Sequence, residues 1–257
     1  MRDPKAIMIT GASSGIGAAL AVAYAGPGRV LALTGRNRVR LDDTSERCRM
    51  AGALVETFIV DVRDYNGLAA WIAEIDAKYP LDLVIANVGI SAGTDTSTGT
   101  DAETDEAIRL IFAVNVGGVI NTVLPVVPLM RRRRRGQIAI ISSLAGFRGF
   151  PGAAAYCASK AAERIFGESL RVELAADGVS VSVICPGFIR TPMTDTNSFA
   201  MPFLMEPCRA ATIIKFGLTR NRARIAFPWR TYAVCWLLAA LPPSWSDRLL
   251  RLAPKKS

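Results

Sequence analysis

The residues best suited to chemistry in this chain are Tyr156 and Lys160, four positions apart, with Ser143 thirteen residues before the tyrosine. The chain contains no histidine, the only side chain whose ordinary pKa lies near neutrality, so proton transfer must use another group. On a helix, positions i and i+4 share one face with Cβ atoms about 5–6 Å apart, which places the Lys160 ammonium near the Tyr156 phenol. A cation about 4 Å away contributes about 4 kcal/mol at an effective dielectric of about 20, which lowers a tyrosine pKa from about 10 to about 7. The spacing predicts a tyrosine acid or base activated by lysine.

A glycine-rich turn follows the first apolar run of the chain, Ala6 to Thr10, and leads into an apolar helix that begins near Ile16. Glycines permit a tight turn and close backbone approach, and they leave helix-terminal N–H groups free to receive a pyrophosphate. The same letters fit the G-x-S-x-G turn of serine hydrolases, but most versions of that chemistry need a histidine base. An ordinary βα turn without a ligand is the plainer alternative. We favour a dinucleotide site formed by Gly11, Ser13, Ser14, Gly15, Ile16 and Gly17.

The end of the second apolar run indicates which dinucleotide the turn binds. Thr34-Gly35 is followed by Arg36, where an NAD-binding fold usually presents an acidic residue to the ribose 2′-hydroxyl. A guanidinium suits a 2′-phosphate, so we expect NADP(H) in preference to NAD(H), with Ser13, Arg38 or Arg40 as additional contacts. The alternative is that these arginines only solvate a surface loop. Asp61 and Val62, after the third run, are expected at the adenine, although an aspartate there is also a common helix cap.

Seven short apolar runs alternate with helical stretches and must position these groups. Such βαβ alternation, with runs apolar on both faces, predicts a parallel sheet covered by helices on each side, a doubly wound α/β fold. The carboxyl ends of its strands then meet at one edge, where ligands bind. The predicted strands are Ala6 to Thr10, Val30 to Thr34, Val55 to Val60, Leu83 to Ala86, Gln137 to Ser142, Val179 to Cys185 and Arg224 to Phe227.

Composition favours one large domain, residues 1–257, because 257 residues with 51% hydrophobic content suffice for one well-buried core. Five cysteines without CxxC spacing fit a reduced compartment and give no sign of a metal site. The N-terminus lacks the apolar core of a secretory signal, so we expect a cytoplasmic protein. The net charge of +9 is concentrated in residues 220–257, where eight Lys or Arg face one acidic residue. No basic stripe with aromatic platforms runs along the body, so nucleic-acid binding is not expected.

Several motifs in order resemble the short-chain dehydrogenase/reductase family, over about Ala6 to Thr191. They are Thr10-Gly11-x-x-x-Gly15-x-Gly17, Asp61, Asn87-Val88-Gly89, Asn115, Ser143, Tyr156-x-x-x-Lys160 and Pro186-Gly187-x-x-x-Thr191. The resemblance implies a single Rossmann-fold domain and a catalytic set of Asn115, Ser143, Tyr156 and Lys160. Tyr156 acts as general acid or base, Ser143 orients the substrate oxygen, Lys160 tunes Tyr156 and holds the nicotinamide ribose, and Asn115 supports a water-mediated proton relay. Cofactor contacts carry over to Asn87, Gly89, Pro186, Gly187, Ile189 and Thr191, with Tyr156 and Lys160.

The resemblance further implies hydride transfer between a nicotinamide and a carbonyl carbon, and with NADPH the reduction of a ketone or aldehyde. Val88 departs from the alanine usual in this turn, and its extra methyls put cofactor affinity in question. The helices that carry Asn115 and Tyr156 usually form a subunit face, which implies a homodimer or homotetramer. The alternative of another class is a non-catalytic dinucleotide-binding regulator on the same fold.

Residues beyond Thr191 bear on substrate and partners. Residues 192–207 contain flexible and aromatic apolar groups that suit a lid over an apolar carbonyl or alcohol, or they complete a core. Residues 228–257 form a basic apolar segment whose ten-residue apolar run is too short to span a bilayer. Its tryptophans and cations suit peripheral contact with an anionic membrane, although packing against the body or a second subunit is the alternative. We interpret Arg131 to Arg135 as a solvated helix end stopped at Gly136, and Thr94 to Thr104 as a mobile loop.

Overall fold

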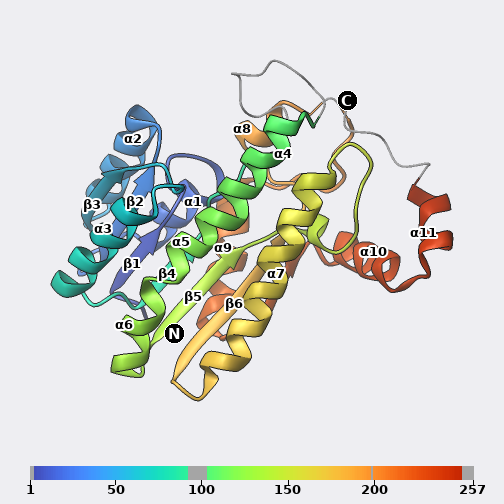
Figure 1. Cartoon of the computed structure of the whole chain (residues 1–257). Coiled ribbons are helices and arrows are strands. Elements are labelled where there is room, and N and C mark those ends of the chain that lie inside the picture. Colours follow the sequence, from blue (N-terminus) through green and yellow to red (C-terminus); the bar gives the residue numbers. More distant parts are fainter. Residues whose placement is uncertain (1–2, 92–102, 198, 251–257) are drawn as a thin grey trace.

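A computed structural model of the chain describes residues 3–91, 103–197 and 199–250 (Figure 1). The predicted loop Thr94 to Thr104 lies outside the described residues except for Glu103 and Thr104. The last seven residues of the predicted basic segment lie outside them as well.

The described residues form one seven-stranded sheet in the order β3-β2-β1-β4-β5-β6-β7, with every adjacent pair parallel. The predicted fold class is therefore confirmed, and each predicted strand is found within a residue of its observed bounds. The strands are β1 Ala6–Ile9, β2 Val30–Gly35, β3 Leu54–Ile59, β4 Leu83–Ala86, β5 Gly136–Ile141, β6 Val179–Pro186 and β7 Arg224–Phe227.

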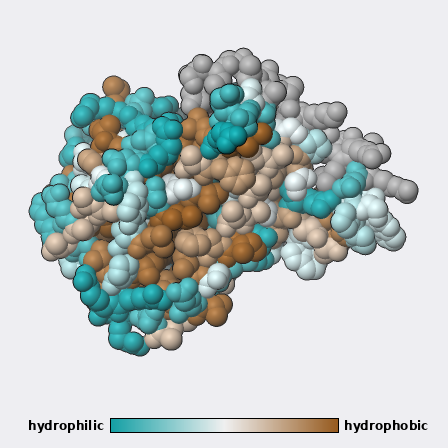
Figure 2. Space-filling model, in the orientation of Figure 1, coloured by the Kyte–Doolittle hydropathy of each residue, from teal (hydrophilic) through white to brown (hydrophobic). Residues whose placement is uncertain are grey.

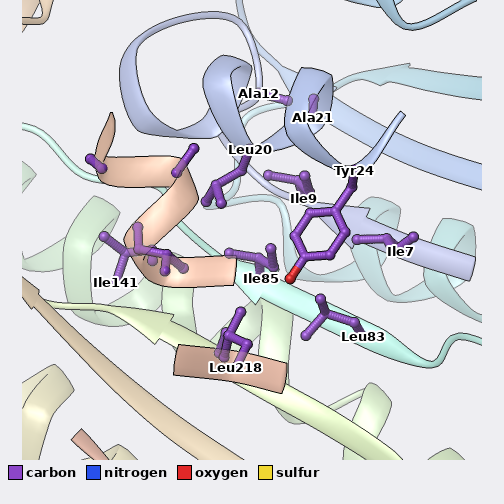
Figure 3. Close-up of a cluster of buried hydrophobic side chains, with 14 of the residues drawn as sticks. Ile7, Ile9, Ala12, Leu20, Ala21, Tyr24, Leu83, Ile85, Ile141 and Leu218 are labelled. Atoms are coloured by element: carbon purple, nitrogen blue, oxygen red, sulfur yellow. The ribbon is translucent and has the colours of Figure 1, made fainter. Parts of the chain in front are cut away.

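Helices cover both faces of this sheet because its strands are apolar on both sides. Successive side chains of a strand point to opposite faces, so Ile7 and Ile9 enter one core cluster while Met8 enters the other. Figure 3 shows the first cluster, in which Leu20 and Tyr24 from α1 contact the sheet. Helices α1, α2 and α9 pack on the face of the sheet that carries the first cluster. Helices α3, α5, α6 and α7 pack on the opposite face.

The helical elements are α1 Gly15–Tyr24, α2 Arg38–Met50, α3 Tyr65–Lys78, α4 Asp105–Ile111, the π-helix η1 Phe112–Gly117, α5 Gly118–Val123, α6 Val126–Arg133, the 3-10 turn η2 Leu144–Gly146, α7 Ala154–Ala175, α8 Pro192–Asp195, α9 Pro207–Thr219, α10 Trp229–Ala240 and α11 Pro243–Leu250. The run Asp105–Arg133 is long and apolar enough to cross a membrane, but half of its most apolar stretch is buried. Val114, Val119 and Val123 belong to the core on one face of the sheet, so this run is a core helix of the domain.

The arginine run at the end of α6 differs from the solvated turn that the sequence suggested. The helix ends in the left-handed conformation at Arg134 (φ 49°), ahead of Gly136, which begins β5. The guanidinium of Arg133 donates to both carboxylate oxygens of Asp76 at 2.8 and 2.9 Å and to the carbonyl of Leu81 at 2.6 Å. Arg131 pairs with Asp177 and Glu173, and Arg135 pairs with Asp82. The run therefore ties α6 to neighbouring elements, because backbone and carboxylate acceptors lie around this helix end.

Candidate active site

A cleft of about 490 Å³ opens at the carboxyl edge of the sheet. The ends of β1, β2 and β4 meet there, as expected for a doubly wound sheet. Its walls come from the glycine turn, the β2–α2 connection, the end of β3, the β4 turn and the start of α8. They comprise Gly11, Ser13 to Ile16, Thr34 to Asn37, Arg40, Val60 to Val62, Asn87 to Ile90, Val114 and Thr191 to Met193.

The glycine turn is shaped as a cradle that larger residues would fill. Gly11 and Gly15 have φ of +67° and +55°, a conformation that costs L residues with a Cβ. A Cβ on Gly17 would lie 2.2 Å from the Gly11 carbonyl oxygen, and one on Gly15 would lie 2.8 Å from Cγ2 of Thr191. The turn opens directly into α1, so helix N–H groups face the cleft as a phosphate site requires. These residues fit the pyrophosphate of a dinucleotide.

Asn87 joins the end of β4 to this cradle. Its side-chain amide donates to the carbonyls of Thr10 and Gly11, each at 3.1 Å, and its backbone N–H donates to the Thr10 hydroxyl at 3.2 Å. Asn87 therefore holds the turn in shape and also lines the cleft. Val88 is half-buried against the core, and its Cγ1 would lie 3.0 Å from a Cβ on Gly118. Part of its extra bulk is therefore directed at helix α5, while the residue also lines the cleft.

The β2 and β3 ends bring charge to the far wall of the cleft. Arg36 and Arg40 line it and are exposed, whereas Arg38, also exposed, is not among the lining residues. Asp61 also lines the cleft, and its carboxylate accepts from the Arg63 guanidinium at 2.7 and 3.0 Å. These hydrogen bonds hold the pKa of Asp61 below its usual value, so it is an ionised acceptor at neutral pH.

Asn115 lies in the π-helix η1, a local widening that often marks functional positions. The side chain is fully buried, accepts from the Ile90 N–H at 2.8 Å and donates to the Ile90 carbonyl at 3.0 Å. Its amide also donates to the Ser159 hydroxyl at 2.9 Å, and that hydroxyl donates to the carbonyl of Tyr156. Asn115 thus connects the β4 turn to the helix that carries Tyr156. Its part in a water-mediated relay remains a prediction.

Ser142 and Ser143 have different surroundings at the end of β5. The buried Ser142 hydroxyl donates to the carbonyl of Lys160 at 2.7 Å, an anchor for α7. Ser143 is half-buried, accepts from the Ala145 N–H at 3.1 Å and lies near enough to the Tyr156 phenol to favour its ionised form. The structure thus brings Ser143 and Tyr156 together and leaves Ser142 occupied elsewhere.

Lys160 corrects the expectation of a lowered tyrosine pKa. Its Nζ lies 5.8 Å from the centre of the Tyr156 ring, so the two side chains are neighbours, as the spacing predicted. Burial raises the pKa of Tyr156 above its ordinary value, and the Lys160 charge and the neighbouring Ser143 hydroxyl offset this only in part. Tyr156 is therefore protonated at neutral pH in this state. The trio adjoins the cleft at Gly89, where a Cβ would lie 3.0 Å from Lys160 Nζ.

Two glutamates near this trio were missed by the sequence reasoning. Glu163 binds Lys160 Nζ through both carboxylate oxygens, each at 2.9 Å; a charge one turn after Lys160, on the same helix face, was the available signal. The carboxylate of Glu103 accepts from the N–H groups of Ala155 and Tyr156 and neutralises the uncapped N-terminus of α7. Nothing local in the sequence indicated that second contact, since it joins residues more than fifty positions apart.

The segment after β6 closes the other side of the cleft. Gly187 N–H donates to the Phe227 carbonyl at 2.8 Å, and Ile189 pairs with Met205 in a short bridge. Thr191 caps α8 and, with Pro192 and Met193, lines the cleft. In the predicted lid, Phe199 packs edge-on against Phe188 with ring centres 5.8 Å apart, and Met205 is buried. The lid is therefore partly core and partly surface.

Comparison with known proteins agrees with this geometry. The sequence pattern of the short chain dehydrogenase family matches residues 5–201. An uncharacterized oxidoreductase of Myxococcus xanthus is 39% identical over 245 residues, 95% of each chain. A 3beta-hydroxysteroid dehydrogenase of Mediterraneibacter gnavus is 36% identical over 197 residues, 76% of this chain and 70% of that protein.

Solved structures show the same fold. A short-chain dehydrogenase from Sphingobium yanoikuyae in complex with NADPH superposes with a TM-score of 0.79 at 26% identity, covering 98% of both chains. One from Mycobacterium paratuberculosis bound to NAD gives a TM-score of 0.76 at 25% identity, covering 89% of this chain and 98% of that one. The chain belongs to the short-chain dehydrogenase/reductase family and is an oxidoreductase that uses a nicotinamide dinucleotide.

Proposed function

We propose that this protein reduces an apolar ketone or aldehyde with NADPH, and oxidises the matching alcohol in reverse. The observation that carries the proposal is the junction at Gly89, where the glycine cradle and its cleft adjoin Lys160, with Ser143 and Tyr156 beside it. When bound, the dinucleotide supplies a hydride to the carbonyl carbon. The protein must then supply a proton to the carbonyl oxygen.

Tyr156 is the proton donor in this proposal. Its raised pKa keeps the phenol protonated at neutral pH, which is the form required for reduction. Ser143, whose hydroxyl lies beside that phenol, holds the substrate oxygen toward it. Lys160 lowers the energy of the phenolate left after transfer, because its ammonium charge lies on the same helix face. The hydride forms the new C–H bond, the phenolic proton forms the O–H bond, and the phenolate is reprotonated from solvent.

Two arginines support NADPH over NADH. Arg36 and Arg40 stand on the cleft wall beside Gly35, where an acidic residue would favour the ribose hydroxyls of NAD. Two guanidinium groups suit the dianionic 2′-phosphate instead. Family members of this fold have been solved with NADPH and with NAD. The proposed preference for NADPH therefore rests on the two arginines.

An apolar substrate is supported by the segment that follows β6. Met193 lines the cleft, and the half-buried Phe188, Phe199 and Met201 lie on the same segment. Methionine and aromatic side chains adapt to bulky apolar ligands. The similar protein from Mediterraneibacter gnavus is a 3beta-hydroxysteroid dehydrogenase, which is a precedent for an apolar ring substrate in a related chain.

The test is oxidation of NADPH, followed by its absorbance, across a panel of apolar ketones and aldehydes, with NADH in parallel. We expect turnover that is faster with NADPH at equal subsaturating concentration. Tyr156→Phe keeps the ring but removes the proton donor, so it should lose turnover while binding NADPH nearly as tightly. Wild-type turnover in Tyr156→Phe refutes the mechanism. Stoichiometric NADPH binding without turnover on any compound supports the regulator alternative.

We further propose a homodimer through the face formed by α4, α5 and α7. Large apolar side chains are exposed there, and Figure 2 shows an apolar band across this face of the molecule. A second copy buries such a band symmetrically. The exposed side chains are Ile108, Phe112, Leu124, Ile165 and Val172. Light scattering is expected to give twice the chain mass, and a monomer at micromolar concentration contradicts the proposal.

We propose that the protein is cytoplasmic and that helix α10 binds it peripherally to an anionic membrane. Figure 1 shows α10 and α11 extending from the side of the domain. In α10, Trp229, Trp236 and Leu237 are more than half exposed, and Cys235 is its single buried residue. Interfacial helices combine such tryptophans with nearby cations, and residues 220–257 carry eight basic side chains against one acidic one.

Co-sedimentation with phosphatidylserine-containing vesicles tests this surface. We expect binding that weakens with salt, is absent on phosphatidylcholine alone, and is lost in the double variant Trp236→Ser and Leu237→Ser. Val39→Ser is the matched control, since Val39 is also exposed (78%) but lies on α2. A change in oligomer mass in the double variant without any vesicle binding assigns the surface to a second copy and refutes the membrane proposal.

A further inference from the structure

Glu163 is a fully buried carboxyl group one turn after Lys160 on α7. Its side chain has no solvent exposure, and that of Lys160 is 5% exposed. The Lys160 ammonium donates to both Glu163 oxygens at 2.9 Å and to the Ile141 carbonyl at 3.1 Å. An ammonium has three N–H donors, so all three are engaged within the protein.

This arrangement conflicts with the role proposed for Lys160. A lysine whose donors are all engaged has none to offer a dinucleotide ribose, and its charge is compensated before it reaches Tyr156. A buried carboxylate is costly unless it is paired, so Glu163 competes for the ammonium. Binding of the dinucleotide at Lys160 must therefore weaken the contact with Glu163.

We propose that Glu163 is a positioning residue that holds the Lys160 ammonium in the free enzyme and takes up a proton when dinucleotide binding draws that ammonium away. The charge of Glu163 thereby sets how strongly Lys160 acts on Tyr156. This inference rests on the proposed function, because it requires that Lys160 bind the dinucleotide.

The surroundings of Glu163 support proton uptake in the neutral range. Burial raises the pKa of Glu163 to about 7, although Lys160 opposes the rise through its charge and hydrogen bonds. Burial alone would lower the pKa of Lys160, but Glu163 and Tyr156 together outweigh it and the net shift is upward. The other titratable groups that face Glu163 are Tyr156 on the same helix and Cys185 on β6. Arg164, Glu168 and Arg224 face Cys185 in turn, so the lysine is the partner that decides the charge of Glu163.

Proton uptake is measured by calorimetric titration of NADPH into the enzyme near pH 8, in buffers of different ionisation enthalpy. Glu163 is then ionised in the free enzyme, and the wild type should take up a large fraction of one proton. Glu163→Gln, which cannot ionise, should take up none, while Glu163→Asp should retain uptake. Glu173→Gln is the matched control: Glu173 is an exposed carboxyl on the same helix, paired with Arg131, and it should behave as wild type.

A second readout is the pH dependence of alcohol oxidation, which requires the Tyr156 phenolate. An ionised Glu163 opposes formation of the phenolate and so raises the pH at which oxidation begins. Because Glu163 is uncharged in the dinucleotide complex, wild type, Glu163→Gln and Glu173→Gln should share the same acidic limb of kcat/KM for the alcohol. A limb that lies lower in Glu163→Gln than in the wild type means that the carboxylate is still ionised in the complex and overturns proton uptake.

Three outcomes separate the inference from the proposed function. Absence of proton uptake in the wild type overturns the role of Glu163 even if the Gln variant fails to fold. Equal uptake in wild type and a folded Glu163→Gln overturns it as well. If neither NADPH nor NADH binds to the wild type, the proposed function fails first, and the inference about Glu163 fails with it.

Discussion

Replacement of Gly17 by alanine tests whether the turn at the start of α1 is a cradle or an ordinary loop. The added Cβ would lie 2.2 Å from the Gly11 carbonyl oxygen, 2.5 Å from Nδ2 of Asn87 and 2.9 Å from the Gly11 carbonyl carbon. Two of these atoms are backbone, so relief requires the backbone of the turn to move. Overpacking of this kind costs about 1–3 kcal/mol. For a chain of this size that lowers the melting temperature by roughly 2–12 °C.

The same displacement weakens dinucleotide binding. Gly11 and Asn87 hold the turn through the 3.1 Å bond between them, and the helix N–H groups that follow are the phosphate donors. Loss of one charge-assisted hydrogen bond costs about 1.5–3 kcal/mol, or roughly 10- to 100-fold in Kd for NADPH.

Thermal melting and fluorescence titration of NADPH measure the two effects. Gly26→Ala is the matched control, since a Cβ on Gly26 meets no atom within 4 Å and its φ is not positive. We expect it to match the wild type in both assays. A Gly17→Ala protein that melts and binds NADPH as Gly26→Ala does refutes the cradle and the phosphate site together.

Three further predictions address charge. Arg36→Asp should raise the Kd for NADPH about 10-fold or more and favour NADH by titration, whereas Arg38→Asp, outside the cleft lining, should change neither. Arg133→Ala leaves the buried Asp76 with only the Leu81 N–H as a donor and removes the Arg133 donor from the Leu81 carbonyl. It should lower the free energy of unfolding by about 1–3 kcal/mol in urea, against little change for the exposed Arg132→Ala. Folding raises the pKa of Glu163 from 4.5 to about 7, so the folded state binds more protons and its stability falls as pH rises through that window. Glu163→Gln should remove about 3 kcal/mol of that decline, and parallel urea curves for the two proteins across the window contradict it.

The fold followed from the sequence because its signals are local. Each strand is a short run apolar on both faces, and the alternation that sends Ile7 and Met8 into different cores is a property of any β-strand. The glycine turn was equally local, since its backbone conformations belong to Gly11 and Gly15 themselves. The arginine run was misread because Asp76 and Asp82, its acceptors, lie some fifty residues away. Sequence distance hides such partners.

The active site shows the same limit in its energetics. The spacing of Tyr156 and Lys160 fixed which face of α7 they share, but the sign of the tyrosine pKa shift depended on burial and on where the ammonium is held. Glu163, three residues after Lys160, fixes the position of the ammonium through two contacts at 2.9 Å. The Lys160 charge, 5.8 Å from the ring centre, lowers the pKa of Tyr156 by less than burial raises it, and Glu163 opposes Lys160, so Tyr156 stays protonated. The free enzyme is thus ready to donate a proton from Tyr156. Formation of the Tyr156 phenolate, the base for alcohol oxidation, depends on separating Lys160 from Glu163.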